Sequence, residues 1–148
     1  MISADSIIEH FDLEPHPEGG FYKRTFLAND NAFSSIVFLL TKGNFSAFHQ
    51  LNSDEQWNWY LGDTIIIHEI FPDGTYKKTE LGKQVLNFQY IVQAGNWFAS
   101  ECVENHGFAF CGCTVIPAFS FDNFILADRK NLTTQFPEHQ EIIERFTR

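Results

Sequence analysis

The chain has 148 residues, of which 44% are hydrophobic, so a single domain can bury a sizeable core without disulfides or a structural metal. Nineteen acidic side chains against ten basic ones give a formal net charge of −9, and no run of Lys or Arg can neutralise a phosphate backbone. We therefore expect no nucleic-acid partner. Seventeen Phe, three Trp and four Tyr favour sheets, because bulky aromatic side chains suit half-buried strand faces.

At the N-terminal end, Ser3 predicts the cap of a short helix that Pro15 stops. A series of short runs rich in Phe, Ile, Val, Tyr and Trp follows, and their regular spacing is typical of strands. These runs cover residues 20–28, 33–41, 45–51, 55–61, 64–71, 76–81, 87–93, 97–103, 108–116 and 123–127. Beyond Pro137, an apolar stripe of Ile142, Ile143 and Phe146 predicts a closing helix.

Many short strands with no helix between them indicate an all-β fold, an antiparallel sandwich or barrel with short terminal helices. No internal repeat or long linker divides the chain, so we expect one domain over residues 1–148. The start of the chain lacks the features of a signal peptide, no apolar run is long enough to span a membrane, and three cysteines fit a reducing compartment. We expect a cytoplasmic protein that does not bind membranes.

The most informative segment runs from Gly43 to Gly62, and its spacing resembles the first sequence motif of the cupins. That motif places ligands at positions that here hold His49, Leu51 and Glu55. On a strand His49 and position 51 share a face, and a short turn allows Glu55 to return to that face on the next strand. Leu51 cannot donate to a metal. His49 and Glu55 are the candidate catalytic residues.

The second cupin motif ordinarily supplies a further histidine after a Pro-x-Gly turn, and the matching segment is Gln93-Ala94-Gly95-Asn96-Trp97-Phe98. Phe98 occupies the histidine position. Two remaining ligands rarely hold a transition metal tightly, so we predict no metal and no other cofactor. A divalent metal remains an alternative if His68, Asp54 or water completes the site.

Two tryptophans extend the candidate site, because period-two counting puts Trp57 and Trp59 on the same face as Glu55. They are candidate walls of a small-molecule pocket, together with Phe98, although at least one of the tryptophans is more typical of plain barrel core. The turn around Glu18, in Pro15-His16-Pro17-Glu18-Gly19-Gly20, adds Glu18 as a candidate ligand-binding residue.

Four blocks taken together resemble the fifth cupin class, a family of unknown function: residues 15–22, 53–57, 93–97 and 112–117. The resemblance implies a double-stranded β-helix, or jelly roll, similar to the sugar-nucleotide epimerases of rhamnose synthesis and usually paired into homodimers. It does not imply a settled reaction. The chain departs from the family pattern at Gln93, where Pro is common, and at Ala118, where Gly is common.

These observations leave two main hypotheses. One is a metal-independent isomerase or epimerase of a carbohydrate-like or nucleotide-sugar-like metabolite, with His49 as general base and Glu55 holding it. The other is a non-catalytic barrel that binds or senses a small molecule. A metal-dependent cupin enzyme is a third reading. We also expect a homodimer, because the edges of an open jelly roll invite another chain.

Overall fold

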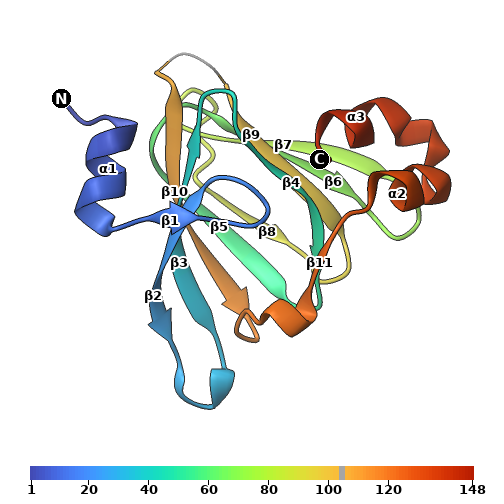
Figure 1. Cartoon of the computed structure of the whole chain (residues 1–148), viewed down its shortest axis with the longest axis horizontal. Helices are drawn as coiled ribbons and strands as arrows, with labels where there is room; N and C mark the ends of the chain where they lie inside the picture. Colours follow the sequence, from blue (N-terminus) through green and yellow to red (C-terminus); the bar gives the residue numbers. More distant parts are fainter. Residues whose placement is uncertain (104–105) are drawn as a thin grey trace.

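The computed structural model describes residues 1–103 and 106–148, and it forms a two-sheet β-barrel with helices at both ends (Figure 1). The elements in chain order are α1 (Ala4–Phe11), β1 (Glu14–Pro15), β2 (Phe21–Leu27), η1 (Asn29–Asn31), β3 (Ser34–Thr41), β4 (Phe45–Leu51), β5 (Asp54–Gly62), β6 (Ile65–Ile70), β7 (Tyr76–Leu81), β8 (Gln89–Val92), β9 (Trp97–Cys102), β10 (Phe108–Ile116), η2 (Phe121–Asn123), β11 (Phe124–Leu126), α2 (Arg129–Gln135), η3 (Pro137–His139) and α3 (Gln140–Arg145).

Each predicted strand is present, within two residues of the expected bounds at either end. Sheet A has the order β1-β2-β3-β10-β5-β8 and sheet B the order β11-β4-β9-β6-β7. All the strand pairings are antiparallel. The all-β jelly roll predicted from the sequence is therefore confirmed.

The main core fills the space between the two sheets, where Phe38, Trp57, Ile67 and Phe98 are almost fully buried. Two smaller clusters lie outside the barrel. One joins α2 and α3 to the outer face of sheet B through Phe48, Ile143 and Phe146, and the other joins α1 to sheet A. Large side chains on both faces of a sheet explain why the sequence carries so many aromatic residues.

The helical part of the chain differs in one respect from the prediction. Residues 129–135 form helix α2, which the sequence analysis did not anticipate, and the side chain of Asp128 caps it by accepting from the Asn131 backbone N–H. The segment after Pro137 first makes a short 3-10 turn and only then the helix α3. None of the helices in the described residues is both long and apolar enough to cross a membrane.

Candidate functional site

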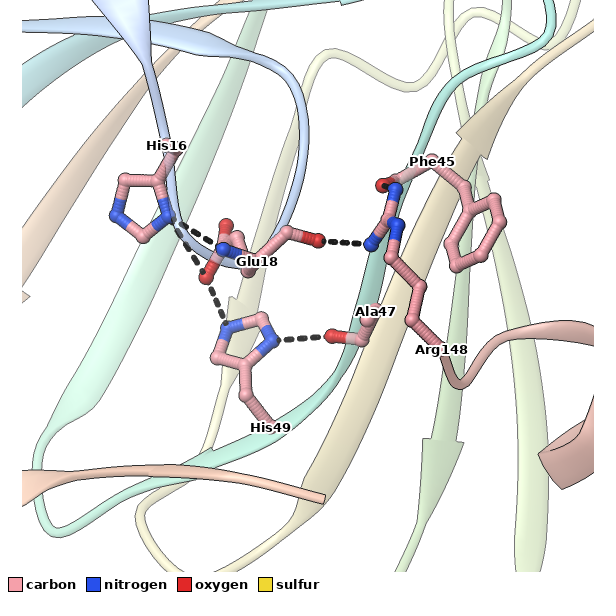
Figure 2. Close-up of polar contacts among 6 residues, drawn as sticks. All are labelled: His16, Glu18, Phe45, Ala47, His49 and Arg148. Atoms are coloured by element: carbon pink, nitrogen blue, oxygen red, sulfur yellow. Dashed lines mark hydrogen bonds and ion pairs between the residues drawn. The ribbon is translucent and has the colours of Figure 1, made fainter. Parts of the chain in front are cut away.

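The site is built around a tight turn of residues 16–20 that docks onto strand β4 (Figure 2). The Glu18 carbonyl accepts from the Ala47 backbone N–H at 2.7 Å and from Arg148 Nη1 at 2.7 Å. Gly19 has a φ of 108°, and a Cβ at this position would stand 2.0 Å from the Phe45 carbonyl oxygen. Only glycine permits so close an approach, so the turn holds the Glu18 side chain against the barrel.

Glu18 and His49 form a buried pair in which Glu18 Oε2 lies 3.1 Å from His49 Nε2. The other ring nitrogen of His49, Nδ1, lies 2.7 Å from the Ala47 carbonyl oxygen. Because a carbonyl only accepts, Nδ1 must carry a proton. A neutral His49 therefore presents a lone pair at Nε2, and the contact with Glu18 is satisfied by a single proton shared between the two groups.

The electrostatics of the pair favour its uncharged form. Burial lowers the pKa of His49 to about 3. Burial, followed by the nearby Glu55 charge, raises the pKa of Glu18 well above its usual range. Since both shifts oppose charge, the shared proton belongs mainly to Glu18, which donates it to His49 Nε2. His16 supports this arrangement, because its Nδ1 accepts from the Glu18 backbone N–H at 3.1 Å and burial lowers its pKa to about 4.

Glu55 faces the pair across a small cavity of about 40 Å³. This volume corresponds to about one to three water molecules. Burial raises the pKa of Glu55 to about 7, and a hydrogen bond from the Cys113 thiol partly opposes the rise. The lining residues are His16, Glu18, Tyr22, Ser34, Ile36, His49, Leu51, Glu55, Cys113, Val115 and Phe119. The cavity is thus lined by two histidines and two glutamates, of which Glu55 changes its charge near neutral pH.

The structure brings three of the sequence-predicted residues together, since His49, Glu55 and Glu18 all line this cavity. Trp57 and Trp59 face the barrel interior on the same side as Glu55, but neither lines the cavity. Trp57 is 1% exposed and packs edge-on against Phe38, and the Trp59 indole donates to the Asp63 carbonyl. Their placement is that of core residues.

Phe98 lies behind His49 rather than at the cavity wall. The two residues are register partners on β4 and β9, and their ring centroids are 4.0 Å apart. The aromatic ring at the usual histidine position therefore packs against the one remaining motif histidine. It helps fix the orientation of the imidazole, and it excludes water from that side.

The donor set does not fit the metal centre typical of cupins. Both ring nitrogens of His49 are engaged, and Leu51 contributes an apolar wall at a ligand position. His68 lies on the outer face of sheet B, and Asp54 accepts from the Ala94 backbone N–H, so neither lines the cavity. Within residues 1–103 and 106–148, no group of three or more His, Cys, Asp or Glu side chains is arranged to hold a metal ion.

Sequence reasoning did not assign roles to three residues of this site. These residues are His16, which lies in the turn, Cys113, whose thiol donates to Glu55, and Arg148, which binds the Glu18 carbonyl. The Pro15-His16-Pro17-Glu18-Gly19-Gly20 segment carried a usable signal, because polar residues between prolines and paired glycines mark a fixed turn. Arg148 carried none, since its partners are backbone carbonyls and one amide oxygen distant in sequence.

The jelly roll and an interior His and Glu pair define a cupin-type barrel. The sequence profile described as Cupin superfamily (DUF985) matches residues 5–127, so the chain belongs to this family. A solved protein of Shewanella oneidensis is 35% identical with a TM-score of 0.94, covering 100% of this chain and 99% of that one. A hypothetical protein of Leishmania major is 27% identical with a TM-score of 0.93, covering 99% of each chain.

More distant matches show the fold alone. An oxalate decarboxylase of Bacillus subtilis is 13% identical, with a TM-score of 0.64, and the match covers 90% of this chain and 37% of that one. A comparison with curated proteins finds no match. Membership of the cupin superfamily supports a small-molecule-binding barrel.

Proposed function

We propose that the interior cavity binds a small carbonyl compound and moves a proton between carbon and oxygen without a metal. The observation that carries this proposal is the shared proton between Glu18 and His49, with Glu55 on the same cavity at a pKa of about 7. A carboxylate with such a pKa is a well-matched general base at neutral pH.

The roles follow from the hydrogen bonds. His49 has no free nitrogen, so it serves as the partner that holds and orients the Glu18 proton. Glu55 takes a proton from the carbon next to the carbonyl, and the Glu18 and His49 pair supplies its proton to the carbonyl oxygen. An enol results, and the return of both protons yields the starting compound or its isomer. The assignment of Glu55 as the general base differs from the sequence-based hypothesis, in which His49 is the base.

The cavity volume narrows the substrate class. Typical small-molecule sites occupy about 300–1,000 Å³, whereas this cavity measures about 40 Å³. A nucleotide sugar would require the wall to move, and a compound of a few heavy atoms requires much less. The same tightness favours the second candidate, a non-catalytic barrel that retains a small ligand.

Deuterium uptake from solvent at carbon, followed by NMR, tests the proposal. Glyceraldehyde and dihydroxyacetone are the small probes, and a nucleotide sugar is the large one. We expect exchange with the small probes, reduced about 100-fold or more by Glu55→Gln, the usual range for loss of a general base. Glu9→Gln, on the exposed face of α1, is the matched control. Binding without exchange would favour the non-catalytic barrel, and exchange that survives Glu55→Gln would refute the assigned base.

A further inference from the structure

A much larger groove lies on the opposite side of sheet B, between its outer face and helix α3. Its volume is about 760 Å³, against about 40 Å³ for the interior cavity, and the two share no lining residue. A space of this size falls within the usual range for small-molecule sites, about 300–1,000 Å³. The cupin site does not account for the polar residues that line it.

A chain of hydrogen bonds runs along one side of this groove and joins four elements of the fold. Tyr76 Oη on β7 lies 2.7 Å from His68 Nδ1 on β6. His68 Nε2 lies 3.0 Å from Glu101 Oε1 on β9. Arg145 Nη2 at the end of α3 donates to Glu101 Oε2 at 2.8 Å. The His68 ring also stacks on Phe146, at 4.7 Å between centroids and 29° between planes.

The direction of each hydrogen bond in this chain can be assigned. Glu101 accepts from Arg145 and, as a carboxylate, accepts again from His68 Nε2–H. Burial lowers the pKa of His68, which keeps the ring neutral and leaves a lone pair on Nδ1. Tyr76 must therefore donate its hydroxyl proton to His68. The oxygen of Tyr76 has no proton left for the groove, so it offers a ligand only lone pairs.

Two cationic side chains, Lys78 and Arg145, line the groove close to Tyr76. Lys78 follows Tyr76 by two residues on β7, so both side chains share a face, and Lys78 is the register partner of His68. Burial raises the pKa of Tyr76, and Lys78 and Arg145 both act against this rise, as positive charges close to the phenol do. Their own partners are Glu80 and Glu101, at 3.0 Å and 2.8 Å. Glu80 does not line the groove, so the lining carries two cations and one carboxylate beside the neutral His68, and this excess of one positive charge favours an anionic group.

We propose that this groove is a second ligand site, independent of the interior cavity, for a small anion that also carries a hydroxyl group. The anionic group binds between Lys78 and Arg145, and the hydroxyl donates to Tyr76 Oη. The ligand hydroxyl thereby extends an ordered chain through Tyr76, His68, Glu101 and Arg145, in which each hydrogen bond polarises the next. The polarity of the chain, rather than the shape of the groove, selects the hydroxyl.

Three probes separate the two recognition elements: inorganic phosphate has the charge alone, glycerol has the hydroxyls alone, and glycerol 3-phosphate has both. Titrations are followed through the imidazole nitrogen signals of His68 in the ¹⁵N-histidine-labelled protein. We expect glycerol 3-phosphate to bind about tenfold more tightly than phosphate, the upper range for one neutral hydrogen bond, and glycerol to leave the His68 signals unchanged.

Two variants and their controls complete the test. Tyr76→Phe is expected to reduce glycerol 3-phosphate binding to the level of phosphate without changing phosphate binding. Lys78→Met is expected to weaken both about tenfold. Tyr60→Phe and Lys83→Met, which alter residues outside the groove, should change neither. Equal affinity for phosphate and glycerol 3-phosphate, or a Tyr76→Phe protein that still distinguishes them, would overturn the proposal. Because His68 lines the groove and not the interior cavity, failure of this test leaves the proposed function of the interior cavity standing.

Discussion

The Oε2 atom of Glu18 lies 3.1 Å from Nε2 of His49, and this contact joins a turn near the start of the chain to the barrel strand β4. The same turn is fixed through its backbone, because the Glu18 carbonyl accepts from Ala47 N–H while the Ala47 carbonyl accepts from His49 Nδ1. Ala47 therefore connects both members of the pair. A small shift of the turn would change the distance over which the proton is shared.

Replacing Glu18 by Gln tests whether this shared proton matters. The amide N–H of Gln can donate to His49 Nε2, so the fold and the contact are kept, but an amide cannot release its proton. We expect deuterium exchange on glyceraldehyde to fall about 100-fold or more, with an unchanged far-UV circular dichroism spectrum. Retention of full exchange in Glu18→Gln would show that the pair is only a structural contact.

Much of the fold followed from the sequence because its signals are local. Alternating apolar residues predict each strand, and turn sequences such as Pro72-Asp73-Gly74 predict where a strand ends. Both signals come from residues that are close together in the chain. Motif spacing then placed His49 and Glu55 on adjacent segments, and both line one cavity. Helix α2 was missed because Arg129–Gln135 has a weak apolar stripe, with Leu132 as its buried residue.

The remaining features of the site depend on contacts that sequence spacing does not encode. The partner of His49 is Glu18 and not Glu55, because the turn that carries Glu18 folds against β4. Glu18 precedes His49 by 31 residues, so no local spacing predicts this contact. The alternation of side chains along a strand also does not distinguish a residue of the packed core from one that lines the cavity. Trp57 and Glu55 share a face, yet only Glu55 reaches the cavity, since the indole fills the space deeper in the barrel.

Glu55 should give the stability of the protein a distinctive dependence on pH. Its pKa rises from an ordinary 4.5 to about 7 in the fold, so its contribution is complete below pH 4.5 and is lost as pH rises through 7. The full loss is on the order of 3 kcal/mol. The neutral Gln in Glu55→Gln has no such loss, so we expect its free energy of unfolding to fall less between pH 5 and 8.

Urea unfolding at several pH values measures this difference. His16 and His49 affect wild type and variant alike. Their pKa values are lowered in the fold, so they reduce the free energy of unfolding of both proteins only as pH falls below 6.5. Glu18 adds a loss of the same sign as that of Glu55. Because the Glu55 charge helps raise the pKa of Glu18, this loss is smaller in Glu55→Gln, which widens the expected difference between the two proteins. Parallel curves for wild type and Glu55→Gln above pH 5 would contradict the raised pKa of Glu55.

Arg148 is predicted to hold the Glu18 turn in place. Besides the bond to the Glu18 carbonyl, its guanidinium donates to the Phe45 carbonyl and to Asn44 Oδ1, and it lies 4.1 Å from the Phe45 ring centroid. We expect Arg148→Met to reduce the hydrogen-exchange protection of the Ala47 amide about tenfold, which corresponds to about 1.4 kcal/mol. It should also change the His49 imidazole ¹⁵N signals.

The matched control is Arg24→Met, which removes an exposed arginine from β2. That change should leave the Ala47 amide and the His49 signals as they are in the wild type. If Arg148→Met behaves in the same way as this control, the turn is held by its glycines and by the Ala47 hydrogen bond alone.

The hairpin of β2 and β3 extends away from the rest of the barrel and presents a surface through which two copies of the chain can assemble (Figure 1). Phe26 is 53% exposed and Phe33 37% exposed, and their rings pack together at 5.3 Å between centroids. Strand β1 pairs only with Phe21 and Tyr22, so the outer edge of β2 beyond Tyr22 has no strand beside it among the described residues. An apolar tip beside an open edge is typical of an interface.

We therefore expect a two-fold symmetric homodimer that buries this hairpin. Phe26→Asp places a charge at the tip and should give a folded monomer, measured by size-exclusion chromatography with light scattering at micromolar concentration. Leu86→Asp is the control, because Leu86 is 79% exposed and lies in the segment between β7 and β8. A monomeric wild type would refute the dimer. A Phe26→Asp protein that still dimerises would refute the hairpin as the interface, since a buried unpaired charge at the centre of a contact is too costly to keep.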